Sequence, residues 1–123
     1  AGLNELDVIG LNLPARTAFL CEVTTHLHGM RPQMVLKMPR KHEQQILYAK
    51  THLQGFRVRY QLWSPLVTST QAETLRSVGF EVIVNADFTR AVEELKQLAK
   101  TNKYDTGNPF MRTLQIIEHL QDS

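Results

Sequence analysis

The sequence predicts an α/β domain in which a mixed β-sheet begins with an antiparallel hairpin and is flanked by helices. Three observations predict this class. Near the N-terminus, two apolar segments lie on either side of a proline-containing turn. Further along, helical and strand-like periods alternate. The 123 residues are 42% hydrophobic, which is enough for one modest core. We expect the order β-hairpin, α, β, α, β, α, α.

The hairpin is expected from the two apolar segments that flank Pro14. Its first strand ends near Leu13, and its second strand covers residues 17–27. Segment 29–39 follows and contains two prolines. Because proline interrupts regular structure, we expect this segment to be a loop.

Helices and strands then alternate toward the C-terminus. Apolar residues at helical spacing predict a helix over about 40–54, and period-two alternation predicts a strand over 56–63. The same patterns predict a helix over 70–78, a buried strand over 81–84, a helix over 88–100 and a last helix that begins at Pro109. We expect all of them to form one domain over 1–123.

Composition excludes several classes of protein. Charged residues make up 21% of the chain, which is typical of a folded globular protein and not of a disordered one. No apolar run reaches the ~18 residues that a membrane-spanning helix needs, so we expect no membrane partner. The single cysteine, Cys21, excludes an internal disulfide framework and a multi-cysteine zinc site. A cytoplasmic location is therefore expected.

The net charge of +2 hides a basic middle segment. Residues 31–60 carry seven lysines and arginines against one acidic residue, Glu43. The segments before and after it are both acidic on balance. This arrangement is typical of a polyanion held next to a carboxylate cluster. The alternative is a helix face that is simply solvated.

Two carboxylates on the hairpin form the sharpest candidate site. Asp7 and Glu22 project to one face of the sheet when the paired positions sum to an odd number. A two-residue loop (13 opposite 16) or a four-residue loop (13 opposite 18) gives this pairing, whereas a three-residue loop places them on opposite faces. Converging carboxylates suit Mg²⁺ or Mn²⁺. The alternative is a pair of ordinary surface residues on a half-exposed sheet.

The run Glu5–Ile9, followed by Phe19–Thr24, resembles the PD-(D/E)xK nuclease superfamily, which has a restriction-endonuclease-like fold. In that superfamily an Asp opens one strand, a (D/E)-x-K tripeptide lies on the next, and a basic helix with glutamine follows. The QxxxY pattern of the RecB-type branch matches Gln44–Tyr48. The resemblance covers about residues 4–62. It implies metal-dependent hydrolysis of DNA phosphodiester bonds, with RNA as an alternative substrate.

The resemblance also implies roles for individual residues. Asp7 and Glu22 would hold the metal together with the Val23 carbonyl, and Glu5 is an auxiliary candidate. Gln44 would orient the attacking water or a phosphate oxygen. The expected nucleic-acid contacts are Arg40, Lys41, Tyr48 and Lys50.

The sequence departs from the superfamily pattern in two ways. Thr24 occupies the position of the catalytic lysine, and the helix that usually precedes the first strand is not found before Asp7. We expect Lys41 to supply the missing ammonium, because it lies one helical turn before Gln44 and shares its face.

Three hypotheses follow from these patterns. The first is a divalent-metal-dependent nuclease. The second is a catalytically decayed nuclease fold that binds nucleic acid or protein, which Thr24 favours. The third is a structural domain that forms a homodimer through the apolar stripe of its last helix.

Two smaller expectations concern single side chains. Cys21 should pack on the sheet face opposite Glu22, and His42 should lie on the exposed side of its helix.

Overall fold

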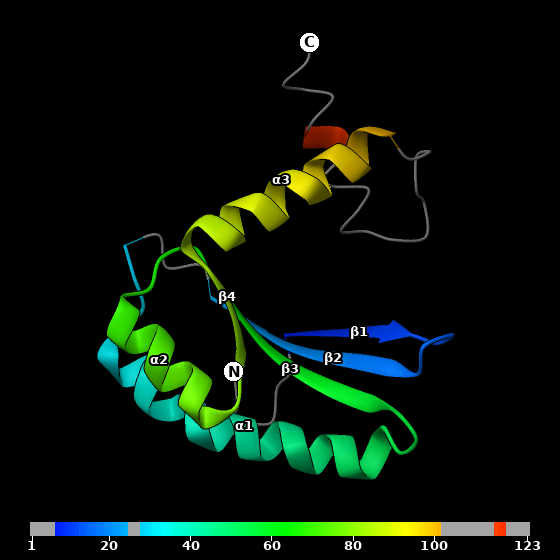
Figure 1. Ribbon diagram of the computed structural model, residues 1–123, viewed down its shortest axis with the longest axis vertical. Helices are drawn as coiled ribbons and strands as arrows, with labels where there is room; N and C mark the ends of the chain where they lie inside the picture. The colour runs from blue at the N-terminus through cyan, green and yellow to red at the C-terminus, as the bar shows by residue number, and fades with distance from the viewer. Residues whose placement is uncertain (1–6, 25–27, 102–114, 118–123) are drawn as a thin grey trace. The chain divides into compact units, whose positions relative to one another are not determined.

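The computed structural model describes residues 7–24, 28–101 and 115–117 and contains a mixed four-stranded sheet with flanking helices (Figure 1). This confirms the α/β class. The elements in chain order are β1 (Val8–Asn12), β2 (Thr17–Val23), α1 (Pro32–His52), β3 (Arg57–Ser64), α2 (Ser69–Val78), β4 (Glu81–Val84) and α3 (Asn85–Thr101).

The strand order is β1-β2-β3-β4. β1 is antiparallel to β2, whereas β2, β3 and β4 run parallel to one another. Parallel neighbours need a crossover connection, and α1 and α2 supply the two crossovers. The expected mixed sheet that begins with an antiparallel hairpin is therefore confirmed.

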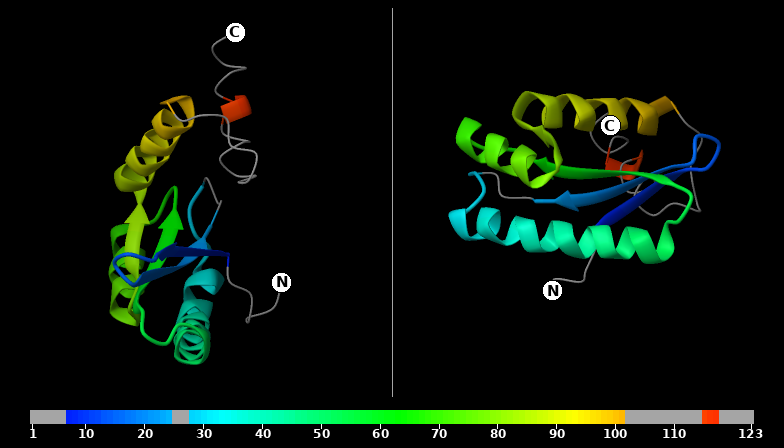
Figure 2. Two further views of the ribbon diagram at one scale, coloured as in Figure 1. Left: turned by 90° about the vertical axis from the view of Figure 1, so that its right-hand side faces the viewer. Right: turned by 60° about the horizontal axis from the view of Figure 1, so that its bottom comes forward.

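The main core lies between one face of the sheet and the helices α1 and α2 (Figure 2). Met38 of α1, Leu62 of β3 and Leu75 of α2 are buried together in it. Side chains alternate between the two faces of a strand, so the buried Leu20 of β2 belongs to the same covered face. Glu22, two residues further along β2, therefore also points beneath the helices.

Helix α1 begins eight residues earlier than the sequence predicted, so the loop expected over 29–39 was wrong from residue 32 onward. Pro32 lies in the first turn, where a backbone N–H has no intrahelical partner to lose. Pro39 lies inside the helix and removes one hydrogen bond. Met34 and Met38 pack into the core, and their burial offsets this cost.

Contacts divide the chain into two units, residues 1–88 and 89–123. The sheet, α1 and α2 belong to the first unit. The second holds most of α3 together with Gln115–Ile117, which are helical; the rest of the helix expected from Pro109 lies outside the described residues. The single domain expected over 1–123 stays a prediction. None of the helices among the described residues combines the length and the hydropathy that spanning a lipid bilayer requires.

The α2 helix ends where the chain passes close to His42. A capping box between Thr68 and Gln71 begins the helix, and Gly79 ends it with a φ of 126°. The His42 ring packs against Tyr60 and Phe80, so the expectation that His42 is exposed was wrong. A Cβ atom on Gly79 would lie 2.5 Å from His42 Nε2. Only glycine fits this position without displacing the ring.

Substituting Gly79→Ala is expected to lower the free energy of unfolding by roughly 2–4 kcal/mol, because it adds a steric clash to an unfavourable positive φ. Gly55→Ala is the matched control: Gly55 also has a positive φ, 85°, but nothing lies within 4 Å of its added Cβ. It should cost about 1 kcal/mol. Urea denaturation followed by circular dichroism measures both values. Equal losses at the two glycines would contradict the role of the His42 contact.

Candidate functional site

The hairpin register brings Asp7 and Glu22 together. β1 and β2 pair from Val8 opposite Cys21 to Asn12 opposite Thr17, which leaves a two-residue turn between positions 13 and 16. Continued by one residue, this register sets Asp7 opposite Glu22 on one face. The pairing predicted for a two-residue loop is confirmed. Asp7 is fixed further by a hydrogen bond, because its Oδ2 accepts from the backbone N–H of Val23 at 2.9 Å.

Glu22 lies beneath α1 and receives two donors from that helix. Only 2% of the residue is exposed. The Lys41 ammonium lies 3.1 Å from its Oε2 atom, and Gln45 Nε2 lies 3.5 Å from its Oε1 atom. Lys41 and Gln45 are four residues apart and therefore share one face of the helix. Both oxygens of the buried carboxylate thus have a partner.

The surroundings of Glu22 disfavour its charged form. Burial raises the pKa of the Glu22 carboxyl, the neighbouring Lys41 ammonium opposes this shift, and the Asp7 carboxylate raises the pKa further by charge and hydrogen bonding. Burial is the largest of these effects, and the Lys41 ammonium acts on the pKa of Glu22 more strongly than the Asp7 carboxylate does.

Asp7 and Glu22 are the candidate ligands for a hard divalent cation. Among the described residues, His, Cys, Asp and Glu form no group of three or more that could hold a metal, so the candidate ligands are the pair Asp7 and Glu22. Mg²⁺ is commonly bound by one or two carboxylates and keeps several waters. Asp7 is exposed and leaves one side of the pair open to water. The auxiliary candidate Glu5 lies outside the described residues.

Thr24 occupies the same covered face as Glu22 but adds no charge to it. It is 5% exposed, and its hydroxyl donates a hydrogen bond of 2.7 Å to Ser64 Oγ. The position of the expected motif lysine is therefore filled by a buried pair of hydroxyl groups. Lys41 is the cation that the structure brings to Glu22.

Gln45, which the sequence analysis did not single out, is the glutamine that contacts Glu22. Gln44 precedes it and is half-buried, so its predicted role stays a prediction. Successive residues are rotated by about 100° around a helix, so a one-residue difference changes the face. A signal in the sequence could have identified Gln45: it lies seven residues after Met38 and four before Ala49, on the buried stripe of α1.

The predicted nucleic-acid contacts divide between different sides of α1. Arg40 and Lys50 are exposed, and Lys50 lies nine residues after Lys41, about half a turn away around the helix. The Tyr48 ring lies 4.7 Å from the His52 ring. The structure thus groups Lys41, but not Lys50, with the carboxylates.

The opposite sheet face has a separate polar network. Cys21 lies there as predicted: its thiol is buried and contacts Gln61 Oε1 at 3.6 Å. Burial raises the pKa of this thiol, which is unfavourable for a nucleophile. On the same face, the Arg59 guanidinium donates to Glu81 at 2.8 Å and stacks over Phe19. Arg59 is therefore already neutralised by a partner within the sheet.

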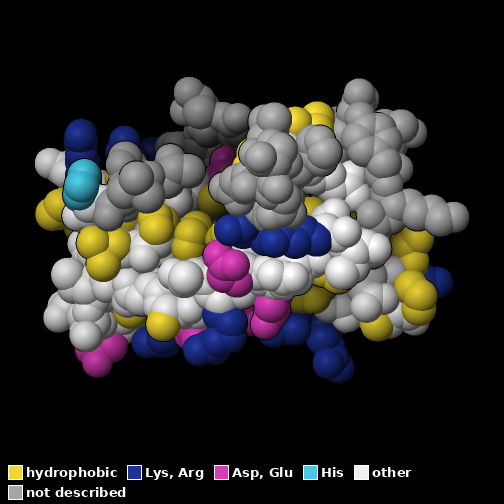
Figure 3. Space-filling model, turned by 90° about the horizontal axis from the view of Figure 1, so that it is seen from above, with side chains coloured by type: hydrophobic (Ala, Val, Ile, Leu, Met, Phe, Trp, Pro, Cys, Tyr) yellow, Lys and Arg dark blue, Asp and Glu magenta, His cyan; other side chains and the backbone are white. Residues whose placement is uncertain are grey.

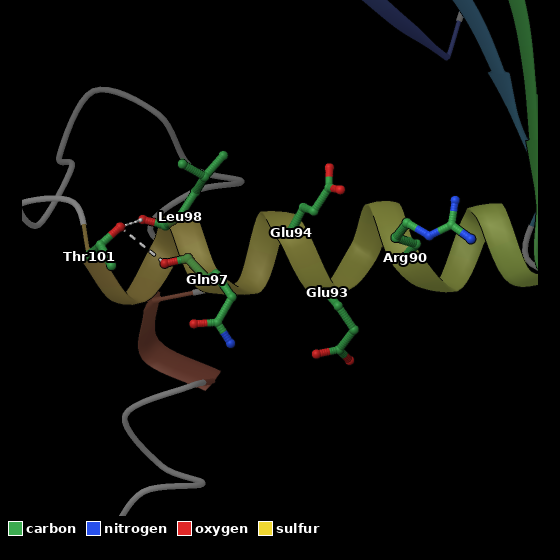
Figure 4. A pocket seen from close by; sticks show the side chains of 6 residues that line it. All are labelled: Arg90, Glu93, Glu94, Gln97, Leu98 and Thr101. Carbon is green, nitrogen blue, oxygen red and sulfur yellow. Dashed lines mark hydrogen bonds between the residues drawn. The ribbon is translucent and has the colours of Figure 1, made fainter.

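Helix α3 carries an open hollow that does not qualify as a binding site. The side chains that line it all come from α3 (Figure 4): Arg90, Glu93, Glu94, Gln97, Leu98 and Thr101. Small-molecule sites usually enclose most of their ligand between several elements, which one helix does not do. In the face shown in Figure 3, basic and acidic side chains are interspersed, unlike the predominantly basic α1.

No family model matches the chain, and neither a curated protein nor a solved structure matches it.

Proposed function

We propose that this chain is a divalent-metal-dependent nuclease that hydrolyses DNA phosphodiester bonds on a restriction-endonuclease-like fold. One observation carries the proposal: the Lys41 ammonium reaches Glu22 at 3.1 Å from the helix that follows the motif strand. Together with Asp7 opposite Glu22, this contact supplies two carboxylates and a cation where the sequence motif lacks its lysine.

Each group has a distinct chemical role in this proposal. Asp7 and Glu22 would hold Mg²⁺ or Mn²⁺, which when bound lowers the pKa of water and neutralises phosphate charge. An ammonium has three N–H donors, and Lys41 uses one on Glu22. The remaining donors stabilise negative charge that develops on the phosphate oxygens. Lys37, four residues earlier and exposed, adds positive charge on the same side of α1.

A second candidate function is a DNA-binding module that has lost cleavage. The Thr24–Ser64 hydrogen bond favours it, because a buried hydroxyl pair cannot supply a charge at the position of the motif lysine. The same basic helix would then bind the phosphate backbone without hydrolysis.

The test is metal-dependent nicking of supercoiled plasmid DNA, for which we expect activity with Mg²⁺ or Mn²⁺ and loss of that activity in Asp7→Asn. Asp7 is exposed and an asparagine oxygen can still accept from Val23 N, so this variant should fold normally. Glu43→Gln, which neutralises an exposed carboxylate on α1, is the matched control and should remain active.

Two outcomes would contradict the nuclease. Salt-sensitive DNA binding without cleavage at any metal concentration would replace it with the binding module. Cleavage that survives Asp7→Asn would remove the carboxylate pair as its site.

A further inference from the structure

Two buried polar atoms next to the site have no partner in the described residues: His42 Nδ1 and Gln45 Oε1. Gln45 is 0% exposed, so water does not reach its carbonyl oxygen. Leaving such a group unpaired typically costs about 1–3 kcal/mol. The two residues are three positions apart on α1, where side chains are neighbours.

The orientation of the Gln45 amide is set by its other end. Nε2 lies 3.5 Å from the Glu22 carboxylate and donates to it. The reversed amide would bring two oxygens together, so the contact with Glu22 fixes which atom faces each way. Oε1 therefore faces away from Glu22 and requires a donor from another residue.

His42 can supply that donor because its ring is held in place and uncharged. The ring centroids of Tyr60 and Phe80 lie 4.7 and 5.0 Å from it, and Gly79 lies against Nε2. Burial lowers the pKa of His42, so the imidazole is neutral at pH 7 and carries one proton. The Gln45 side chain raises that pKa and so opposes the effect of burial.

We infer that His42 is a positioning residue: its neutral ring carries the proton on Nδ1 and donates it to Gln45 Oε1, which holds the amide on Glu22. One proton on Nδ1 pairs both orphaned atoms. The chain His42–Gln45–Glu22 then fixes one carboxylate oxygen while Lys41 holds the other. The effect that we expect His42 to have on metal affinity rests on the proposed function. Partners that orient a metal ligand in this way typically contribute 10- to 100-fold to metal affinity.

The tautomer can be observed directly in the metal-free protein. Long-range ¹H–¹⁵N NMR of the full chain should show the His42 proton on Nδ1, with the resonances assigned by their loss in His42→Phe. In Gln45→Leu the preference for Nδ1 should disappear. A proton on Nε2 in the unsubstituted protein would overturn the inference.

A pair of substitutions separates positioning from packing. His42→Asn keeps an N–H donor close to the place of Nδ1 but loses the ring, whereas His42→Phe keeps a ring against Tyr60 and Phe80 but loses the donor. Calorimetric titration with Mn²⁺ should show affinity lowered by about 10- to 100-fold in His42→Phe and less in His42→Asn. Thermal stability should follow the opposite order.

The reverse result, with metal affinity following stability, would reduce His42 to a packing residue. If the unsubstituted chain binds no Mn²⁺, the proposed function fails, and the NMR measurement still decides the tautomer.

Discussion

Lys41→Met is expected to lower the rate of DNA cleavage by about 10²- to 10³-fold, the usual effect of removing one group that stabilises transition-state charge. Methionine keeps the apolar stem of the side chain and removes only the ammonium that lies 3.1 Å from Glu22. Because that charge is needed most when the phosphate acquires negative charge, Mn²⁺ should still bind at Asp7 and Glu22. Cleavage rates and Mn²⁺ titrations at pH 8 measure the two effects separately.

Two further variants sharpen this prediction. Lys50→Met removes an exposed lysine from the other side of α1 and should leave the rate nearly unchanged. Thr24→Lys combined with Lys41→Met moves the ammonium to the motif position on the same sheet face as Glu22, and it should restore part of the lost rate. Thr24 is buried against Ser64, so the melting temperature of the double variant must be measured alongside its cleavage rate. Full activity in Lys41→Met would show that Lys41 does not take the role of the missing motif lysine.

Glu22→Gln should abolish cleavage and at the same time stabilise the metal-free protein. Glutamine has nearly the same shape but no charge, so it binds Mg²⁺ or Mn²⁺ poorly. Burial raises the pKa of Glu22, which means that the folded state disfavours the charged carboxylate. Removing that charge should increase the free energy of unfolding by on the order of 1 kcal/mol at pH 8.

The stability gain should depend on pH in a defined direction. Below the ordinary Glu value of 4.5, Glu22 is protonated in both states and the substitution changes little. As pH rises above 4.5, the unfolded chain loses the proton first, so the stability that the protonated Glu22 contributes is lost through the raised folded-state pKa. Urea unfolding in EDTA should therefore show a stability difference between Glu22→Gln and the unsubstituted protein that widens as the pH rises. A less stable Glu22→Gln at pH 8 would mean that the Lys41 pair outweighs burial.

The parts of the site that depend on strand geometry could be predicted from the sequence. Side chains alternate along a strand, and a short turn limits the register, so Asp7 facing Glu22 and Cys21 on the reverse face both follow from residue numbers. The choice of Lys41 depended on helical spacing, and its contact with Glu22 is consistent with that choice. Strand alternation was sufficient for Asp7, Glu22 and Cys21, whereas the contact of Lys41 with Glu22 also depends on how α1 packs against the sheet.

Features that depend on tertiary packing could not be predicted in the same way. Pro32 and Pro39 indicated a loop, but core contacts of Met34 and Met38 extend the helix through both prolines. The phase of α1, that is, its rotation about its own axis relative to the sheet, then places Gln45 against Glu22. That phase is set by packing across the whole core, which the spacing within one helix does not determine.

The two-residue turn of the hairpin constrains how this protein can vary during evolution. Fourteen residues separate Asp7 from Glu22, and the turn at Pro14–Ala15 divides them equally. Gaining or losing one residue there would turn β1 over and move its carboxylate to the reverse face, unless a bulge compensates. Insertions and deletions in functional homologues should therefore come in pairs. Distant homologues can therefore be sought by one pattern: an Asp and a Glu that lie on either side of a turn and are separated by an even number of residues.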